Sequence, residues 1–291
     1  FCGAFIMLLK PIHPKEVIEY DYVIIDPNLN AQYFYEVEAQ LKSLAPDYAK
    51  NVQYVFPYLL RLNSVDASLV DEIKQHDQNQ IKAGLSPFFL MTFKSVPTRE
   101  PDIVDHLKQN LVYEVGTKKY LYRFFDPKIW MLLNYFESQD FLWINKYFKN
   151  IEFNFLNETL CFDAGSEGDF IQQPDHDLLE KISVNNRVFE KLKFKTDDLP
   201  AYFLKVNQIF NYANLIKHKG ILTKDDAVAS IFHADLIGES FLETHFFQRL
   251  TESPKGYEQA SKQLSTSEWD DFFKKQNIDD ENLKIKVMYD Y

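Results

Sequence analysis

Hydrophobic and polar positions along the first half of the chain follow two different periods. Short runs that are apolar at nearly every position suit strands buried on both faces. Segments with apolar residues three and four positions apart suit helices that cover such a sheet. The expected strands are Tyr20–Ile25, Tyr54–Leu62, Pro87–Phe93, Tyr120–Phe125 and Ile151–Phe155, the last paired with Thr159–Phe162 as a hairpin, and the expected helices are Ala31–Leu44, Ser68–Ala83 and Asp102–Leu111. Because strands and helices alternate, the pattern predicts an α/β lobe with a mixed or largely parallel sheet flanked by helices.

The run Tyr120–Phe125 is the centre of this lobe, and Asp126 and Pro127 follow it directly. Proline lacks an N–H, but its fixed φ suits the first turn of a helix, and an aspartate before it can cap the free amides. We therefore expect a core strand, a turn and a helix in direct succession. The strand contains one charge, Arg123. A buried guanidinium needs a carboxylate or several carbonyls, and Asp26 and Asp126 are the candidate carboxylates.

The second half of the chain has a helical pattern throughout. The polar loop Asp163–Asp169, which contains two of the eight glycines, separates it from the first half. The expected helices are His176–Leu192, Leu199–Lys217, Thr223–Leu250 and a short helix that opens with a capping box at Ser265–Glu268. The sequence therefore predicts an α/β domain over residues 17–162, a linker over 163–174 and an all-helical lobe over 175–291.

Charge and cysteine content narrow the functional classes. The 291 residues include 32 basic and 43 acidic side chains, which gives a formal net charge of −11. Nucleic acids and anionic membranes attract basic surfaces, so we expect neither as a partner. No apolar run approaches the roughly 20 residues of a membrane span, and the first ten residues lack the basic start of a secretory signal. Cys2 and Cys161 form no disulfide framework, which suits a reducing cytoplasm.

Motifs that carry chemistry are weak in this sequence. No glycine-rich phosphate loop is present, and Gly238–Leu242 departs from the nucleophile elbow at its last position. The loop Asp163–Asp169 lacks the ligands of a calcium loop, and the seven histidines form no metal-binding pair. We therefore expect no catalytic residue, no cofactor and no metal. Arg61, Arg123 and Asp126 are the strongest polar candidates, and we interpret them with Asp26 as a structural cluster of the core rather than as an anion or catalytic pocket.

Aromatic residues are abundant, with 26 Phe and 17 Tyr. Two adjacent pairs, Phe246-Phe247 and Phe272-Phe273, place one ring on each side of a helix. Core packing accounts for one ring of each pair, and the other ring either joins the core or stays exposed for a partner helix. With Trp269, these five residues are the candidate partner-binding residues.

Four motifs in the first half resemble a known family. They are VIIDPNL at Val23–Leu29, PYLLRL at Pro57–Leu62, PFFLMTF at Pro87–Phe93 and YRFFDPKIWMLL at Tyr122–Leu133. In order and spacing they resemble the type VI secretion adaptor proteins, also called Tap or TEC effector chaperones, whose shared domain was long known only as a domain of unknown function. The piece YRFFDP is the family's most recognisable one. One departure is Lys128, where the family often has an arginine. Lysine keeps the positive charge but cannot bind a carboxylate with two parallel hydrogen bonds, which puts a carboxylate-binding role at that position in doubt.

The resemblance implies a non-catalytic adaptor in the cytoplasm of a Gram-negative bacterium. Such proteins bind a toxic effector and help to load it onto the VgrG spike. We expect the α/β lobe to act as a scaffold, and the helical lobe or the groove between the lobes to hold an apolar or amphipathic segment of the effector. Two alternatives stay open: an immunity protein that neutralises a toxin, and a hydrolase or transferase with a dispersed site around Arg61, Arg123 and Asp126.

Overall fold

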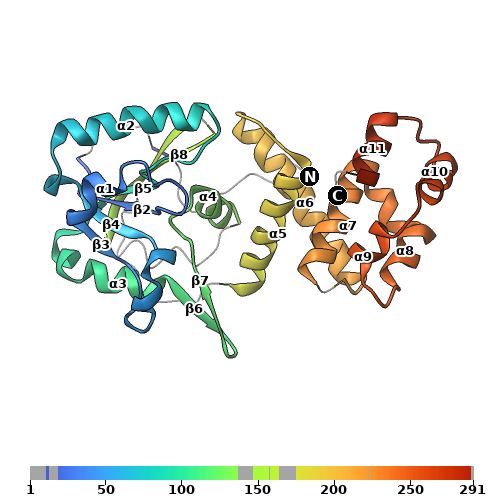
Figure 1. Ribbon diagram of the computed structural model, residues 1–291, viewed down its shortest axis with the longest axis horizontal. Coiled ribbons are helices and arrows are strands. Elements are labelled where there is room, and N and C mark those ends of the chain that lie inside the picture. Colours follow the sequence, from blue (N-terminus) through green and yellow to red (C-terminus); the bar gives the residue numbers. More distant parts are fainter. Residues whose placement is uncertain are drawn as a thin grey trace. The chain divides into compact units, whose positions relative to one another are not determined.

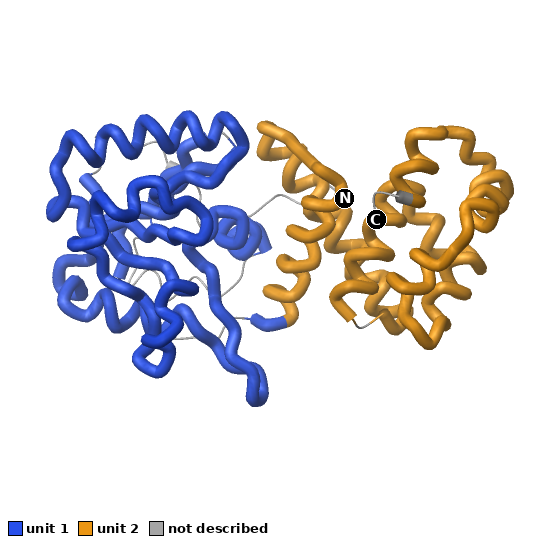
Figure 2. The backbone as a smooth tube through the Cα atoms, in the orientation of Figure 1, with its two compact units in different colours: residues 1–176 blue, residues 177–291 orange. Residues whose placement is uncertain are grey.

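The computed structural model describes residues 11–12, 19–136, 147–156, 158–163, 175–221 and 223–289. The chain divides into two units, residues 1–176 and 177–291 (Figure 2). The expected linker over 163–174 lies outside the described residues apart from Asp163, which ends a strand, and Cys2 also lies outside them. Strands and helices in the first unit and helices alone in the second confirm the predicted fold class among the described residues.

A seven-stranded sheet organises the first unit, in the order β1-β9-β8-β5-β2-β4-β3. Its strands are β1 (Pro11–Ile12), β2 (Tyr22–Ile25), β3 (Leu41–Ser43), β4 (Tyr58–Arg61), β5 (Met91–Ser95), β8 (Phe148–Phe155) and β9 (Glu158–Asp163). The expected parallel pairing is wrong, because every pair in this sheet is antiparallel. The helix between β4 and β5 does join strands of the same direction, but β2 lies between them and pairs with both.

Two expected elements of the first unit differ from the structure. The segment Ala31–Leu44 is not one helix: it divides into α1 (Phe34–Val37), a 3-10 turn at Glu38–Gln40 and strand β3, which pairs with β4. The expected core strand Tyr120–Phe125 is also wrong. Strand β7 (Lys118–Leu121) pairs with β6 (Val112–Val115) as a separate hairpin, and the fully buried rings of Phe124 and Phe125 belong to a turn.

Helices cover both faces of the large sheet. Helix α2 (Ala67–Lys82) runs along one face of the sheet (Figure 1). Its Val70 and Ile73 pack in one apolar cluster with Val23, Ile25 and Leu60 of β2 and β4. The opposite face carries the residues that alternate with these along the strands, such as Ile24 of β2 and Phe93 of β5. There the indole of Trp130 in α4 (Pro127–Tyr135) lies 5.0 Å from the ring of Phe153 and 4.5 Å from that of Phe162. A further helix of this unit is α3 (Ile103–Asn110).

The second unit packs helices around α7. Its helices are α5 (His176–Leu192), α6 (Leu199–His218), α7 (Lys224–Ile237), α8 (His245–Thr251), α9 (Tyr257–Lys262), α10 (Thr266–Lys275) and α11 (Glu281–Tyr289), with a 3-10 turn at Glu239–Glu243. The expected single helix Thr223–Leu250 ends early, because Gly238 takes a φ of 115° that stops α7. Residues 228–234 are all buried, so neighbours surround α7 on every side. The predicted capping box at Ser265 is confirmed.

Candidate functional sites

Arg123, Asp26 and Asp126 come together, as the sequence predicts. The Arg123 Nη2 lies 3.4 Å from Oδ2 of Asp26 and 3.8 Å from Oδ2 of Asp126. Asp26 is 2% exposed, and its Oδ1 accepts hydrogen bonds from the backbone and side-chain nitrogens of Asn28. Asp126 caps α4 by accepting from the backbone N–H of Lys128. The cluster therefore fixes the end of β2 to the start of α4.

Arg61 does not belong to this cluster, which corrects the prediction for it. Its side chain is 51% exposed, and its Nη2 lies 2.7 Å from Oε1 of Glu100. The hydroxyl of Tyr22 donates to the same oxygen at 2.8 Å. Arg61 pairs in register with Tyr22 at the first residue of β2, whereas Asp26 follows the last residue of that strand. The two arginines thus lie at opposite ends of β2, and the residues of the expected dispersed enzyme site are not brought together.

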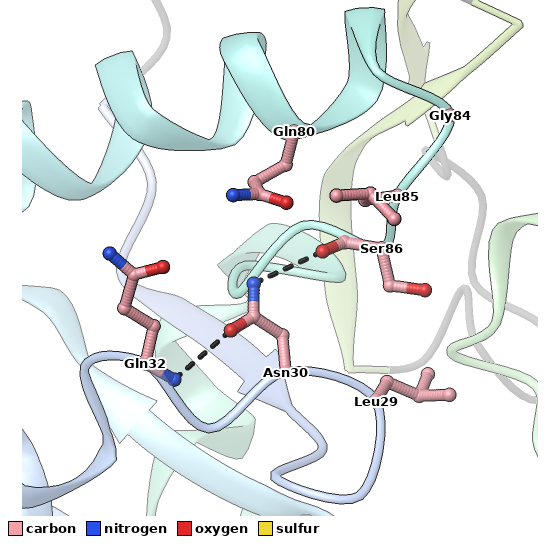
Figure 3. Close-up of a pocket in the computed structure, with 7 residues that line it drawn as sticks. All are labelled: Leu29, Asn30, Gln32, Gln80, Gly84, Leu85 and Ser86. Carbon is pink, nitrogen blue, oxygen red and sulfur yellow. Dashed lines mark hydrogen bonds between the residues drawn. The ribbon is translucent and has the colours of Figure 1, made fainter.

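A hollow of about 360 Å³ opens between the loop that precedes α1 and the end of α2 with the loop that follows it (Figure 3). Its wall contains side-chain amides, a hydroxyl and two leucines that reach solvent. Leu85 is 58% exposed and Leu29 is 38% exposed. The lining residues are Leu29, Asn30, Gln32, Gln80, Gly84, Leu85 and Ser86. None of these side chains carries a charge.

Hydrogen bonds hold the two loops of this hollow together. The Asn30 amide nitrogen donates to the carbonyl of Ser86 at 3.1 Å, and its oxygen accepts from the N–H of Gln32 at 3.0 Å (Figure 3). Gly84, with a φ of 74°, allows the chain to leave α2 sharply. The side-chain nitrogen of Asn30 therefore joins the two loops, while its side-chain oxygen bonds within its own loop.

Asp77 of α2 anchors the loop that carries Leu85. This carboxylate is 3% exposed and accepts from the backbone N–H of Phe88 at 2.6 Å and of Phe89 at 2.8 Å. Both phenylalanine rings enter the core beneath. The anchor leaves the side chain of Leu85 outside. The sequence did not predict this site. Its only local signal is a helix stop at Gly84 followed directly by a leucine.

The predicted partner-binding aromatic residues of the helical unit are mostly core, which corrects that prediction. Phe247, Trp269, Phe272 and Phe273 are between 0% and 4% exposed. Both rings of the pair Phe272-Phe273 are buried because α10 packs against its neighbours on two sides. Phe246 alone of the five is half-buried. It lines a groove between α8 and α10 together with the edge of Phe272.

The other residues considered for catalysis or metal binding have structural positions. Ser240 lies in the 3-10 turn after α7 and not at a strand-to-helix turn, so Gly238–Leu242 is no nucleophile elbow. His233 is buried in α7, where its Nδ1 lies 2.7 Å from the hydroxyl of Tyr257. In the described part of the chain, no group of three His, Cys, Asp or Glu side chains could hold a metal ion.

Comparison with known proteins yields no relative for this chain. No protein-family model, no curated protein and no solved structure matches it. Among the helices of the described residues, none has the length and apolar character needed to cross a membrane. Its function must therefore be inferred from its own residues.

Proposed function

We propose that this protein is a non-catalytic adaptor that binds a toxic effector of type VI secretion in the cytoplasm of a Gram-negative bacterium and delivers it to the VgrG spike. The nature of the partner rests on the motif resemblance around YRFFDP. The mode of action rests on one observation, the uncharged hollow with its two exposed leucines in the first unit.

The chemistry of this hollow suits a peptide. Side-chain amides such as those of Gln32 and Gln80 can both donate and accept hydrogen bonds, as a peptide backbone requires. Leu29 and Leu85 offer apolar contact to a side chain of the bound segment. Ligand sites combine apolar walls with a few polar groups that fix orientation. An uncharged wall gives no ionic partner to a phosphate or a carboxylate substrate, and it favours a neutral segment of a protein.

Exposed apolar side chains gather on the same unit. Seven of the nine large hydrophobic residues that are exposed in the described chain belong to residues 1–176: Leu29, Tyr35, Tyr48, Tyr54, Val55, Leu85 and Val115. The Asn28 side chain donates to the backbone carbonyl of Tyr54 at 2.9 Å, which ties the segment of Tyr54 to the residue before Leu29. Tyrosine, which supplies three of the seven, is enriched at the centres of protein interfaces. These residues favour the α/β lobe as the effector-binding unit, in place of the helical lobe or the groove between the lobes expected from the sequence.

Charge adds long-range attraction for a basic partner. Residues 1–176 include 24 acidic and 16 basic side chains, so this unit has the larger part of the net charge of −11. A field of one sign raises the rate of encounter with a partner of the opposite sign. The uncharged hollow then supplies the specific contact. In this mechanism the adaptor covers an apolar segment of the toxin, which cannot aggregate while it is bound, and competing contacts on the spike release it.

The Leu85→Asp variant tests this proposal. We expect its affinity for the toxin encoded beside its gene to fall at least about tenfold, because a buried apolar contact of roughly 1.5–3 kcal/mol is lost and a charge is introduced. Titration calorimetry with both purified proteins measures the change. Leu204→Asp is the matched control, since Leu204 is 70% exposed in the other unit and its change should leave the affinity intact. Equal affinities for both variants and the wild type would contradict the proposal.

Binding that maps to the catalytic domain of the toxin would instead indicate an immunity protein.

A further inference from the structure

The hairpin of β6 and β7 forms a small sheet of its own, in which each strand has only the other as a neighbour. Val115 pairs with Lys118 across a two-residue turn, in which Gly116 takes a φ of 61°. In Figure 1 the hairpin extends away from the large sheet, with this turn at its far end. A pair of strands alone is marginally stable in water, so contacts with the rest of the unit must hold it in place.

The base of the hairpin is packed on both faces. On one face, Val112 and Leu121 pack against a small buried cluster of the same unit. On the other face, the rings of Tyr113 and Tyr120 stack with centroids 5.3 Å apart, and the His176 ring lies 5.2 Å from that of Tyr120. Tyr113 is buried, whereas Tyr120 is half-buried. A strand laid beside β7 would therefore extend an aromatic stack that already exists.

The register of the hairpin shows which backbone groups of β7 are free. The N–H of Tyr122 donates to the carbonyl of Leu111 at 2.8 Å, which fixes the hydrogen-bonded positions of the ladder. These positions alternate along an antiparallel pair, so Tyr120 bonds inward to β6, whereas Lys119 and Leu121 direct their N–H and C=O groups outward. In the described part of the chain, these outward groups have no hydrogen-bond partner.

An open edge of this kind selects an extended backbone. Only another strand matches N–H and C=O groups at this spacing, and strand addition is a recurrent mode of peptide recognition. A second copy of β7 is disfavoured, because Lys118 and Lys119 of both copies would come together at the new edge. Lys118 is exposed and has no acidic partner among the described residues. The edge of β6 offers no such charge, since its Glu114 already pairs with Lys119 at 3.1 Å.

We infer that the edge of β7 is a docking site for an extended segment of a partner protein, which adds to the hairpin as a third, antiparallel strand. Lys119 and Leu121 each exchange a pair of hydrogen bonds with the residue opposite. Tyr120 and Lys118 occupy the other positions, where the side chains of neighbouring strands come closest. The segment therefore carries an aromatic residue opposite Tyr120 and, two positions later, an acidic residue opposite Lys118. This inference does not depend on the proposed function, and the site shares no residue with the leucine hollow.

A synthetic strand tests the inference on the full-length protein. The probe is a fluorescent, blocked peptide with the core Thr-Tyr-Thr-Glu, in which Tyr lies opposite Tyr120 and Glu lies opposite Lys118. Two further peptides carry one N-methyl group each. Methylation of the Thr between Tyr and Glu removes the donor opposite Lys119, so we expect the affinity in anisotropy titrations to fall at least about tenfold. Methylation of the Tyr nitrogen, which points away from β7, should leave the affinity unchanged.

Two variants at Lys119 provide the matched comparison on the protein. Lys119→Pro removes the outward N–H and keeps the ladder of the hairpin, because an edge strand tolerates proline where its nitrogen faces solvent. Lys119→Ala removes the same side chain and keeps the N–H. We expect the proline variant to bind the parent peptide about tenfold more weakly than the alanine variant does. Lys118→Glu should weaken it about fivefold, and neither Lys74→Glu on α2 nor Leu85→Asp should change it.

Hydrogen exchange locates the bound peptide. We expect the amides of Lys119 and Leu121 to become protected when the parent peptide is added, and those of Val112 and Glu114 on the edge of β6 to exchange as before. Absence of binding, equal binding of the two methylated peptides, or protection at β6 in place of β7 would overturn the inference. A dimer in sedimentation experiments that Lys119→Pro dissociates and Lys119→Ala does not would also overturn it, because the edge would then take a second copy of the chain.

Discussion

We expect His233 alone to remove about 4–5 kcal/mol of unfolding free energy as the pH falls from 6.5 to 3. Burial lowers the pKa of this imidazole to about 3, and the positive charge of Lys191 acts in the same direction. The unfolded chain takes up the proton near pH 6.5, whereas the folded protein stays unprotonated until about pH 3. Because the unfolded state binds more protons in this window, the stability from His233 is complete above pH 6.5 and decreases as the pH falls.

Urea unfolding at pH 7, 5.5 and 4 measures this effect against a variant. His233→Gln removes the titrating group and keeps a polar side chain beside the hydroxyl of Tyr257, which lies 2.7 Å from His233. The variant should lose less stability than the wild type between pH 7 and 4. His245→Gln is the control, since His245 is exposed on α8 and its change should leave the pH dependence as it was. The same pH dependence in wild type and His233→Gln would show that another group governs acid unfolding.

Asp77→Asn should destabilise the first unit by about 3 kcal/mol. The carboxylate accepts from two buried N–H groups, those of Phe88 and Phe89, one at each oxygen. An amide side chain keeps one acceptor but turns an NH₂ group toward the other N–H. Since this loop also carries Leu85, the variant should loosen the hollow as well as lower the stability.

Two measurements distinguish the consequences of Asp77→Asn. Urea unfolding gives the change in free energy, and hydrogen exchange at the amides of Phe88 and Phe89 reports on the loop itself. Asp71→Asn is the matched control, because Asp71 is exposed on the same helix and its change should stay within about 0.5 kcal/mol. Unchanged exchange at both amides in Asp77→Asn would mean that the carboxylate does not anchor the loop.

Helices with local start and stop signals could be predicted from the sequence. The bounds of α5 were predicted fully, and those of α2 and α6 to within one residue at each end. The capping box at Ser265 also appeared where the pattern placed it. These signals are local, because a cap needs only a few neighbouring residues. The long helix predicted over Thr223–Leu250 failed at Gly238, since the hydrophobic pattern continues through the break that its positive φ creates.

Strand pairing could not be predicted in the same way. Leu41–Ser43 has a helical pattern but joins the sheet because β4 offers it a pairing edge. Phe124 and Phe125 are as apolar as a core strand, yet they fill the core from a turn. Apolar runs predict burial, whereas pairing and direction depend on contacts between distant segments.

The candidate sites show the same limit. Arg123 lies beside the two carboxylates predicted for it, Asp26 and Asp126, because the charge of the buried Asp26 requires a partner. The leucine hollow was missed, since its walls come from residues 29–32 and 80–86, which no periodicity connects. The predicted surface role of Phe272 and Phe273 failed because α10 is covered on both sides, a fact of packing between helices and not of the helix itself.

We propose that this protein acts by covering an apolar segment of a toxin. The most direct test is co-expression of the toxin from the neighbouring gene in its native bacterium, with and without this protein, followed by measurement of the soluble and the secreted toxin. We predict that without this protein the toxin aggregates and is no longer secreted, and that Leu85→Asp reproduces this loss while Leu204→Asp does not. Toxin that stays equally soluble and equally secreted in its absence would contradict the claim.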